Sequence, residues 1–82
     1  MKTKIYVIID TQINKNGNVF SYVLQTGRSK NDVLKMLKDY RLAVKHIYHC
    51  TDISFDEDKI ELRFYRPFSE ITSIVRVSET EI

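Results

Sequence analysis

The stretch Thr26-Gly27-Arg28-Ser29-Lys30-Asn31-Asp32, followed by Val33-Leu34-Lys35-Met36-Leu37-Lys38-Asp39-Tyr40, decides the fold of this chain. Ser29 is a favourable N-cap, and Asp32 lies where a carboxylate complements the positive end of a helix dipole. At 100° per residue, one side of the following run is apolar. That side consists of Val33, Leu34, Met36, Leu37 and Tyr40. The stretch therefore predicts an amphipathic helix that ends near Tyr40-Arg41 and lies on a sheet, with its apolar side against the strands.

Strand-like segments lie on both sides of this helix. The predicted strands are residues 4–11, 19–25, 43–51, 59–66 and 71–77. Asn16-Gly17 is a strong hairpin signal between the first two, and Gly27 is expected to end the second in a conformation that other residues resist. Pro67, which has no backbone N–H, closes the fourth. The order ββαβββ predicts an α+β fold, with one antiparallel sheet and a single helix packed on one face.

The composition is that of one small globular domain. With 82 residues, 43% hydrophobic and 29% charged, the chain is expected to form a single domain over residues 1–82, and residues 78–82 a flexible acidic tail. The only cysteine, Cys50, excludes an internal disulfide and suits a reducing compartment. The apolar run Ile5-Tyr6-Val7-Ile8-Ile9 stops at Asp10, too short for a signal peptide or a membrane span. We expect a cytoplasmic protein that does not associate with membranes.

Apolar residues occupy both sides of the first predicted strand, so one helix cannot cover them all. Tyr6 and Ile8 alternate with Ile5, Val7 and Ile9, and we assign Tyr6 and Ile8 to the open face of the sheet. The candidate protein-binding residues on this face are Tyr6, Ile8, Tyr65 and Ile74. Monomers seldom leave such an apolar patch exposed. Both a second copy, giving a homodimer, and a different protein partner are compatible with it.

Charge is distributed unevenly along the chain. Residues 1–50 carry nine Lys and Arg against three Asp, whereas residues 51–82 carry four Lys and Arg against eight Asp and Glu, so the two parts carry +6 and −4. Cations near the predicted helix and on the fourth strand are candidates for binding an anion or a nucleic acid. They are Arg28, Lys30, Lys35, Lys38, Arg41, Arg63 and Arg66. The sequence does not decide whether they form one patch.

No motif specifies a reaction or a metal. His46, His49 and Cys50 are close in sequence, but a strand over 43–51 would point the two histidines to opposite faces. The acidic run Asp52–Asp58 resembles a calcium loop, yet Glu57 stands where such a loop requires Gly. We therefore assign no catalytic residue, metal or cofactor.

These observations predict a non-catalytic protein-binding module, in particular a small regulator or inhibitor that acts through the open sheet face. The alternative is a nucleic-acid-binding domain that uses the basic helix surface. An enzyme acting through Cys50 and a neighbouring histidine is the third class, and it has the least support because no acid–base pair with a pocket around it can be recognised.

Overall fold

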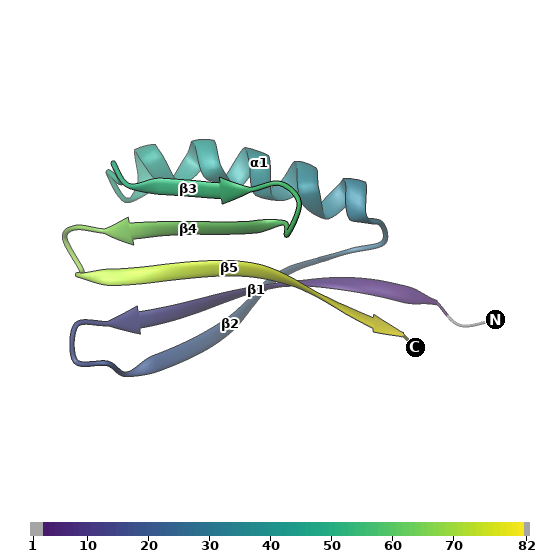
Figure 1. Ribbon diagram of the computed structural model, residues 1–82, viewed down its shortest axis with the longest axis horizontal. Helices are drawn as coiled ribbons and strands as arrows, with labels where there is room; N and C mark the ends of the chain where they lie inside the picture. Colours follow the sequence, from purple (N-terminus) through teal and green to yellow (C-terminus); the bar gives the residue numbers. More distant parts are fainter. Residues whose placement is uncertain (1–2, 82) are drawn as a thin grey trace.

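The computed structural model describes residues 3–81 and contains five strands and one helix in the order ββαβββ. The elements are β1 (Lys4–Asn14), β2 (Val19–Gly27), α1 (Lys30–Ile47), β3 (Ile53–Asp56), β4 (Glu61–Arg66) and β5 (Ile71–Glu81). All strand pairs are antiparallel, and the strand order across the sheet is β2-β1-β5-β4-β3 (Figure 1). The expected α+β fold, one antiparallel sheet with a single helix, is confirmed.

The long antiparallel pair of β1 and β5 forms the centre of the sheet. Their ladder runs from Lys4 opposite Glu81 to Asn14 opposite Ile71. Residues 78–81, which we expected in a flexible tail, instead continue β5, because the first half of β1 provides backbone partners for them. The last residue of that expected tail, residue 82, lies outside the described residues.

The helix begins as the sequence predicts and ends later. The Ser29 hydroxyl accepts a hydrogen bond from the Asp32 N–H at 3.1 Å, which caps the first turn. The apolar stripe continues past Tyr40 to Val44, which is fully buried, and the helix ends only at Ile47. The Tyr48 N–H closes it with a bond to the Val44 carbonyl at 3.0 Å.

The predicted strand over residues 43–51 is therefore wrong. Val44 lies seven positions after Leu37 on the same side of the helix, and burying it there outweighs the weaker alternation of this segment as a strand. The third strand is instead β3, which pairs with β4 from Ile53 opposite Phe64 to Asp56 opposite Glu61. It lies in the segment that we expected to connect two strands.

The two glycines act in different ways. Gly17 has φ 84° in the β1–β2 turn, where its N–H donates to the Asn14 carbonyl at 3.0 Å, so the expected hairpin is present. Gly27 does not have a left-handed conformation. A Cβ there would lie 2.7 Å from Val33 Cγ1, so glycine is needed because the helix passes close to the strand end.

The core lies between α1 and the middle strands. Val33, Leu37 and Val44 of the helix pack against the sheet, and four strand residues complete the centre of the cluster with Cys50. These strand residues are Ile8 of β1, Leu62 and Phe64 of β4, and Val75 of β5. Tyr40 meets Phe64 edge to face, with ring centroids 6.0 Å apart.

The assignment of Ile8 to the open face is wrong. Ile8 is 2% exposed and belongs to the core, with Tyr6 packed against it on the helix side. The register with β5 explains this, because Ile8 lies opposite Val77 and Asp10 opposite the buried Val75. Residues in the alternate positions of β1, Ile5, Val7 and Ile9, consequently face away from the helix.

Among the described residues, no helix is long and apolar enough to cross a membrane.

Replacing Leu37 by Ala should lower the free energy of unfolding by about 2–4 kcal/mol, because the side chain is 1% exposed in the centre of the core. Lys35→Ala, on the exposed side of the same helix, should change it by less than about 0.5 kcal/mol. Chemical denaturation of both variants measures these values. Equal losses would contradict the orientation of the helix.

Candidate interaction surface

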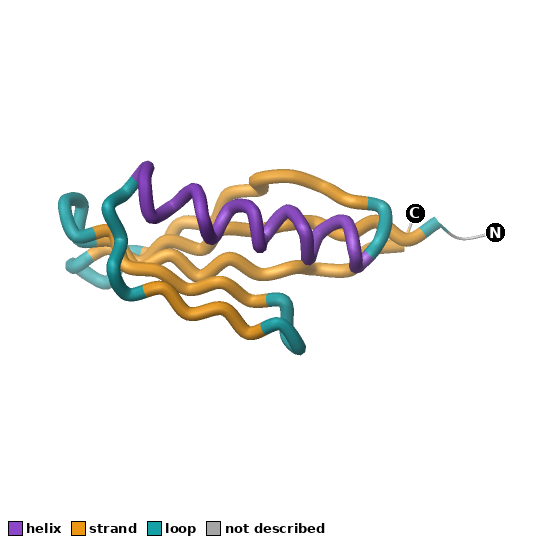
Figure 2. The backbone as a smooth tube through the Cα atoms, turned by 90° about the horizontal axis from the view of Figure 1, so that it is seen from above, coloured by secondary structure: helices purple, strands orange, loops and turns teal. Residues whose placement is uncertain are grey.

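The helix leaves one edge of the sheet uncovered. The helix starts beside the end of β2, and Gly27 at that end is the single buried residue of the strand. The rest of β2 lies to one side of the helix (Figure 2). At its other end α1 lies nearer β3, where the Arg41 guanidinium sits 5.7 Å from the centre of the Phe55 ring. No β2 side chain belongs to the core of the described chain.

The β2 strand exposes large apolar side chains on both of its faces. The exposed fractions are 59% for Val19, 51% for Phe20, 52% for Tyr22, 65% for Val23 and 43% for Leu24. The strand contains no charged residue. Large apolar residues exposed to this degree on both faces of one edge strand are a feature that marks interaction sites.

An apolar groove lies beside β2 on the helix side. Its volume is about 480 Å³, and its apolar lining includes Leu24 of β2 and Met36, Tyr40 and Ala43 of α1, with the buried Ile8 of β1. Gln25 and Asp39 are the polar residues that line it. Cross-strand partners share a face, so Tyr22, opposite the buried Asp10, also lies on the helix side. The groove therefore extends the exposed surface of β2 toward the helix.

The two edges of the sheet differ in how well they are protected against pairing. β3 has only four residues, ends at Asp56 and is preceded by Asp52. Short length and nearby charges are ordinary protections of an edge strand. β2 has nine residues and neither of these two protections, and its register irregularity lies between Val23 and Gln25, after the segment 19–23. Of the two edges, β2 is therefore the less protected against pairing with a further strand.

Free backbone groups on this edge can be assigned from the turn. The Asn14 N–H donates to the Asn18 carbonyl at 3.1 Å, and hydrogen-bonded pairs alternate along an antiparallel ladder. Asn14 and Asn18 form the first hydrogen-bonded pair, so Phe20 opposite Gln12 and Tyr22 opposite Asp10 direct their backbone groups to β1, up to the irregularity between Ile8 and Ile9. The residues that direct N–H and C=O groups to the free edge are Val19, Ser21 and Val23.

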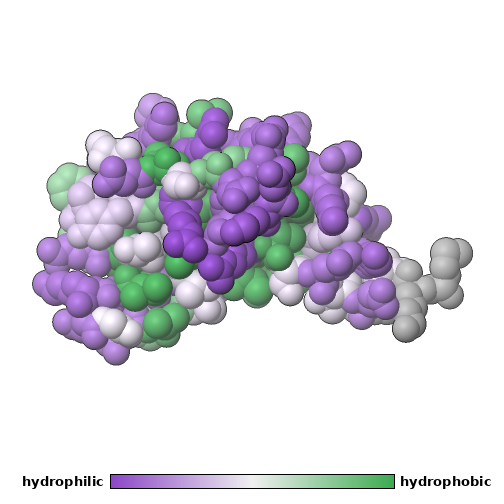
Figure 3. Space-filling view, in the orientation of Figure 1, coloured by the Kyte–Doolittle hydropathy of each residue, from purple (hydrophilic) through white to green (hydrophobic). Residues whose placement is uncertain are grey.

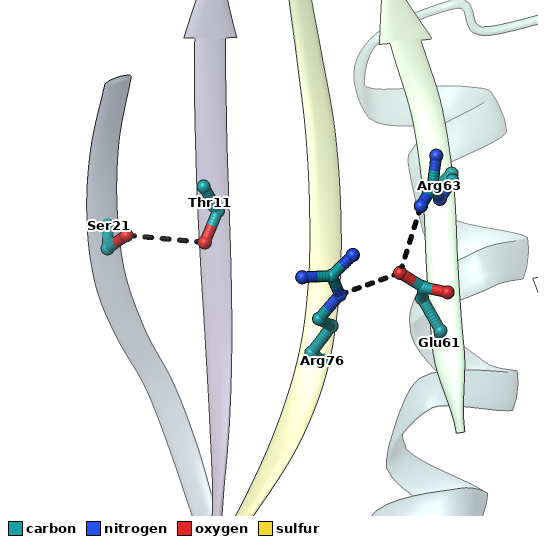
Figure 4. Close-up of polar contacts among 5 residues, drawn as sticks. All are labelled: Thr11, Ser21, Glu61, Arg63 and Arg76. Atoms are coloured by element: carbon teal, nitrogen blue, oxygen red, sulfur yellow. Dashed lines mark hydrogen bonds and ion pairs between the residues drawn. The ribbon is translucent and has the colours of Figure 1, made fainter. Parts of the chain in front are cut away.

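The face of the sheet opposite the helix combines apolar and charged groups. Glu61 accepts hydrogen bonds from Arg76 at 2.7 Å and Arg63 at 3.3 Å, and Thr11 and Ser21 are joined at 3.2 Å (Figure 4). The bond from Arg76 holds the pKa of Glu61 below its ordinary value. In the orientation of Figure 1, hydrophilic side chains cover the middle of the molecule, and apolar side chains lie on either side of them (Figure 3).

Two of the predicted open-face residues do lie opposite the helix. Ile74 is paired with Thr11 and Arg63, and Tyr65 follows Arg63 at the next position of the same face. Tyr65 is 40% exposed, whereas neighbouring strands partly bury Ile74. These two residues remain candidates for binding, and they are separated from Tyr6 and Ile8 by the full thickness of the sheet.

Arg66 is not available for an external anion. Its guanidinium lies 3.3 Å from Asp10 Oδ2 and 3.9 Å from the centre of the Tyr48 ring, and its side chain is 12% exposed. The Gln12 amide also donates to Asp10 Oδ2, at 2.9 Å, and Asp10 is 1% exposed. Burial, followed by the charges of Tyr48 and Asp10, raises the pKa of Tyr40 to about 12. This polar cluster holds β1 and β4 together under the end of the helix.

The remaining predicted cations do not gather in one patch. Lys38 forms an ion pair with Glu57, Arg41 lies over Phe55, and Arg63 is bonded to Glu61 on the opposite face of the sheet. Arg28, Lys30 and Lys35 are exposed near the first turns of the helix. The basic set is therefore divided among two faces and the interior.

The residues considered for catalysis or metal binding are also dispersed. Cys50 is 6% exposed, and burial raises the pKa of its thiol. His46 is an exposed helical residue, while His49 follows the helix end at φ 54° and packs edge to face on Phe68. Within residues 3–81, no three His, Cys, Asp or Glu side chains come together as a group able to hold a metal ion.

The candidate interaction surface on β2 was not predicted from the sequence. The sequence predicted a strand over residues 19–25 but not whether the helix covers it, and Phe20, Tyr22 and Leu24 are all more than two-fifths exposed. The absence of charge from residues 19–27 was the available signal, because an edge strand without charges is unprotected.

Comparison of the chain with protein-family models, with curated proteins and with solved structures found no match in any of the three.

Arg66→Met should lower the free energy of unfolding by about 3 kcal/mol or more, since it leaves the Asp10 carboxylate buried without its cation. The double variant Asp10→Leu, Arg66→Met should regain most of this loss. Arg63→Met is a matched control, because the Arg63 side chain is 52% exposed and Glu61 keeps its ion pair with Arg76, so this change should cost less than about 1 kcal/mol. Denaturant titrations that gave equal losses for Arg63→Met and Arg66→Met would contradict the account of the buried pair.

Proposed function

We propose that this protein is a non-catalytic protein-binding module that uses β2 to bind an extended segment of a partner. The single observation that carries the proposal is the exposure of this nine-residue, charge-free edge strand beside an apolar groove. A partner strand would gain backbone hydrogen bonds from Val19, Ser21 and Val23, and its side chains would gain apolar contacts on both faces. Binding of this kind requires no catalytic group or cofactor.

Protein binding has more support than nucleic-acid binding. The exposed surface of β2 is apolar, whereas nucleic-acid sites collect cations that release counterions from phosphates. Of the seven candidate cations, Arg66 is largely buried and paired with Asp10, and Lys38 and Arg63 are also paired with acidic groups. We propose a role as a small regulator or inhibitor, which would act by occupying a partner's surface. The buried free thiol of Cys50 is compatible with action in the cytoplasm.

Selection of random peptides displayed on phage tests the proposal directly. Wild-type protein should select apolar peptides rich in β-branched and aromatic residues. Ser21→Pro should bind them at least about tenfold more weakly, because proline removes one free-edge N–H and blocks the approach of a strand. The substitution spares the ladder to β1, since the Ser21 N–H points to the free edge. Isothermal titration with the selected peptides gives both dissociation constants.

Lys35→Ala is the control for this experiment, as an exposed helical change away from β2, and it should bind the peptides like wild type. Peptides that bound Ser21→Pro as tightly as wild type would contradict the use of β2. Failure to select any peptide, together with salt-dependent binding of random-sequence RNA or DNA, would favour the nucleic-acid alternative.

A further inference from the structure

The exposed part of β2 has a symmetric sequence. Val19-Phe20-Ser21-Tyr22-Val23 reads the same by side-chain class in both directions: a β-branched residue, an aromatic residue, serine, an aromatic residue and a β-branched residue. Two such segments that pair antiparallel around Ser21 would place every residue opposite one of its own class. Self-complementarity of this kind is what a two-fold interface requires.

We propose that β2 pairs with β2 of a second copy, with the two-fold axis passing beside Ser21. The inference rests on the proposed use of β2 as a binding strand and names its partner. It gives a continuous antiparallel sheet through both protomers, with the two helices on the same side of that sheet.

The backbone geometry fits this register. The groups that point to the free edge belong to Val19, Ser21 and Val23, so Ser21 meets Ser21 of the second copy as a hydrogen-bonded pair. Val19 and Val23 form the next hydrogen-bonded pairs on either side. Each such pair exchanges two N–H···O bonds, and the register gives about six inter-chain backbone bonds.

The side chains fit it as well. Phe20 of one copy lies opposite Tyr22 of the other, in positions without backbone bonds between them, where side chains approach most closely. Aromatic pairs in cross-strand positions are stabilising. Both rings project on the helix side, next to the groove lined by Leu24 and Met36, and both are about half exposed in the single chain. No like charges oppose each other, because the strand carries none.

A dimer that met through the open face would be less favourable. That face carries Glu61 with Arg63 and Arg76, and the two arginine side chains are 52% and 61% exposed. Covering them would remove these charges from water, at a cost that ion pairing only partly offsets. The charge-free edge avoids this cost.

Charged substitutions at Ser21 test whether the two-fold axis of the dimer passes beside this residue. Sedimentation velocity of wild type up to millimolar concentration should show a monomer–dimer equilibrium. Ser21→Lys and Ser21→Glu should each raise the dissociation constant at least about tenfold, because each places two like charges opposite each other. An equimolar mixture of the two variants should dimerise again, since unlike charges then meet across the axis. Circular dichroism establishes that both variants are folded.

Ser54→Lys and Ser54→Glu are the matched controls, because Ser54 is an exposed serine on β3, at the other edge. They should leave the dissociation constant unchanged. A wild type that stays monomeric, or Ser21 variants that dimerise like wild type, would overturn the proposal. If the dimer results are negative but the selected peptides still bind Ser21→Pro more weakly than wild type, pairing between two copies is excluded and β2 remains a binding strand. If neither the dimer nor the weaker binding of peptides to Ser21→Pro is observed, the proposed function is contradicted as well.

Discussion

One helix cannot cover a five-stranded sheet, and this constraint shapes the whole molecule. A helix with its side chains is about 10 Å across, whereas five strands spaced about 4.8 Å apart span about 19 Å between the outer strands. α1 covers the middle strands and reaches β3 through Arg41 and Phe55. The part of the sheet that the helix leaves uncovered is β2, whose first eight residues are all exposed. The candidate interaction surface is thus a direct consequence of how the core is closed.

A buried ion pair completes the packing beyond the last apolar side chains of the helix. Asp10 and Arg66 meet beneath Tyr48, whose ring lies nearly parallel to Phe64 with centroids 5.9 Å apart. Asp10 Oδ1, Arg66 Nε and Ser73 Oγ are buried without a hydrogen-bond partner in the described chain. A buried pair that is incompletely bonded adds little net stability, but removing one member is costly. The cluster therefore fixes the relative position of β1 and β4 more than it strengthens the fold.

The sequence predicts the order of the elements well because their local signals are strong. The Ser29 cap, the stripe from Val33 to Leu37 and the Asn16-Gly17 turn each depend on nearby residues. The helix end was harder to predict, because the alternation of Ala43 to Ile47 as a strand is imperfect and the helix is favoured there by the long-range burial of Val44.

The two faces of β1 could not be distinguished from the sequence for a related reason. Tyr6 and Ile8 alternate with three other apolar residues, so periodicity alone permits either orientation. The choice is made by β5 and β4, which place Val75, Leu62 and Phe64 on the side of Ile8, and by Arg66, which allows Asp10 to be buried there. The candidate surface on β2 could not be located either, since its exposure depends on where the helix stops covering the sheet.

The central claim is that the outer edge of β2 pairs with another strand, and amide hydrogen exchange measured by NMR at increasing protein concentration tests it most directly. The Phe20 and Tyr22 amides face β1 and should be protected at every concentration. The Ser21 and Val23 amides face the free edge, and they should exchange rapidly in dilute protein and become protected as the concentration rises. Rapid exchange of Ser21 and Val23 at every concentration, unchanged by peptides selected on the protein, would contradict the account.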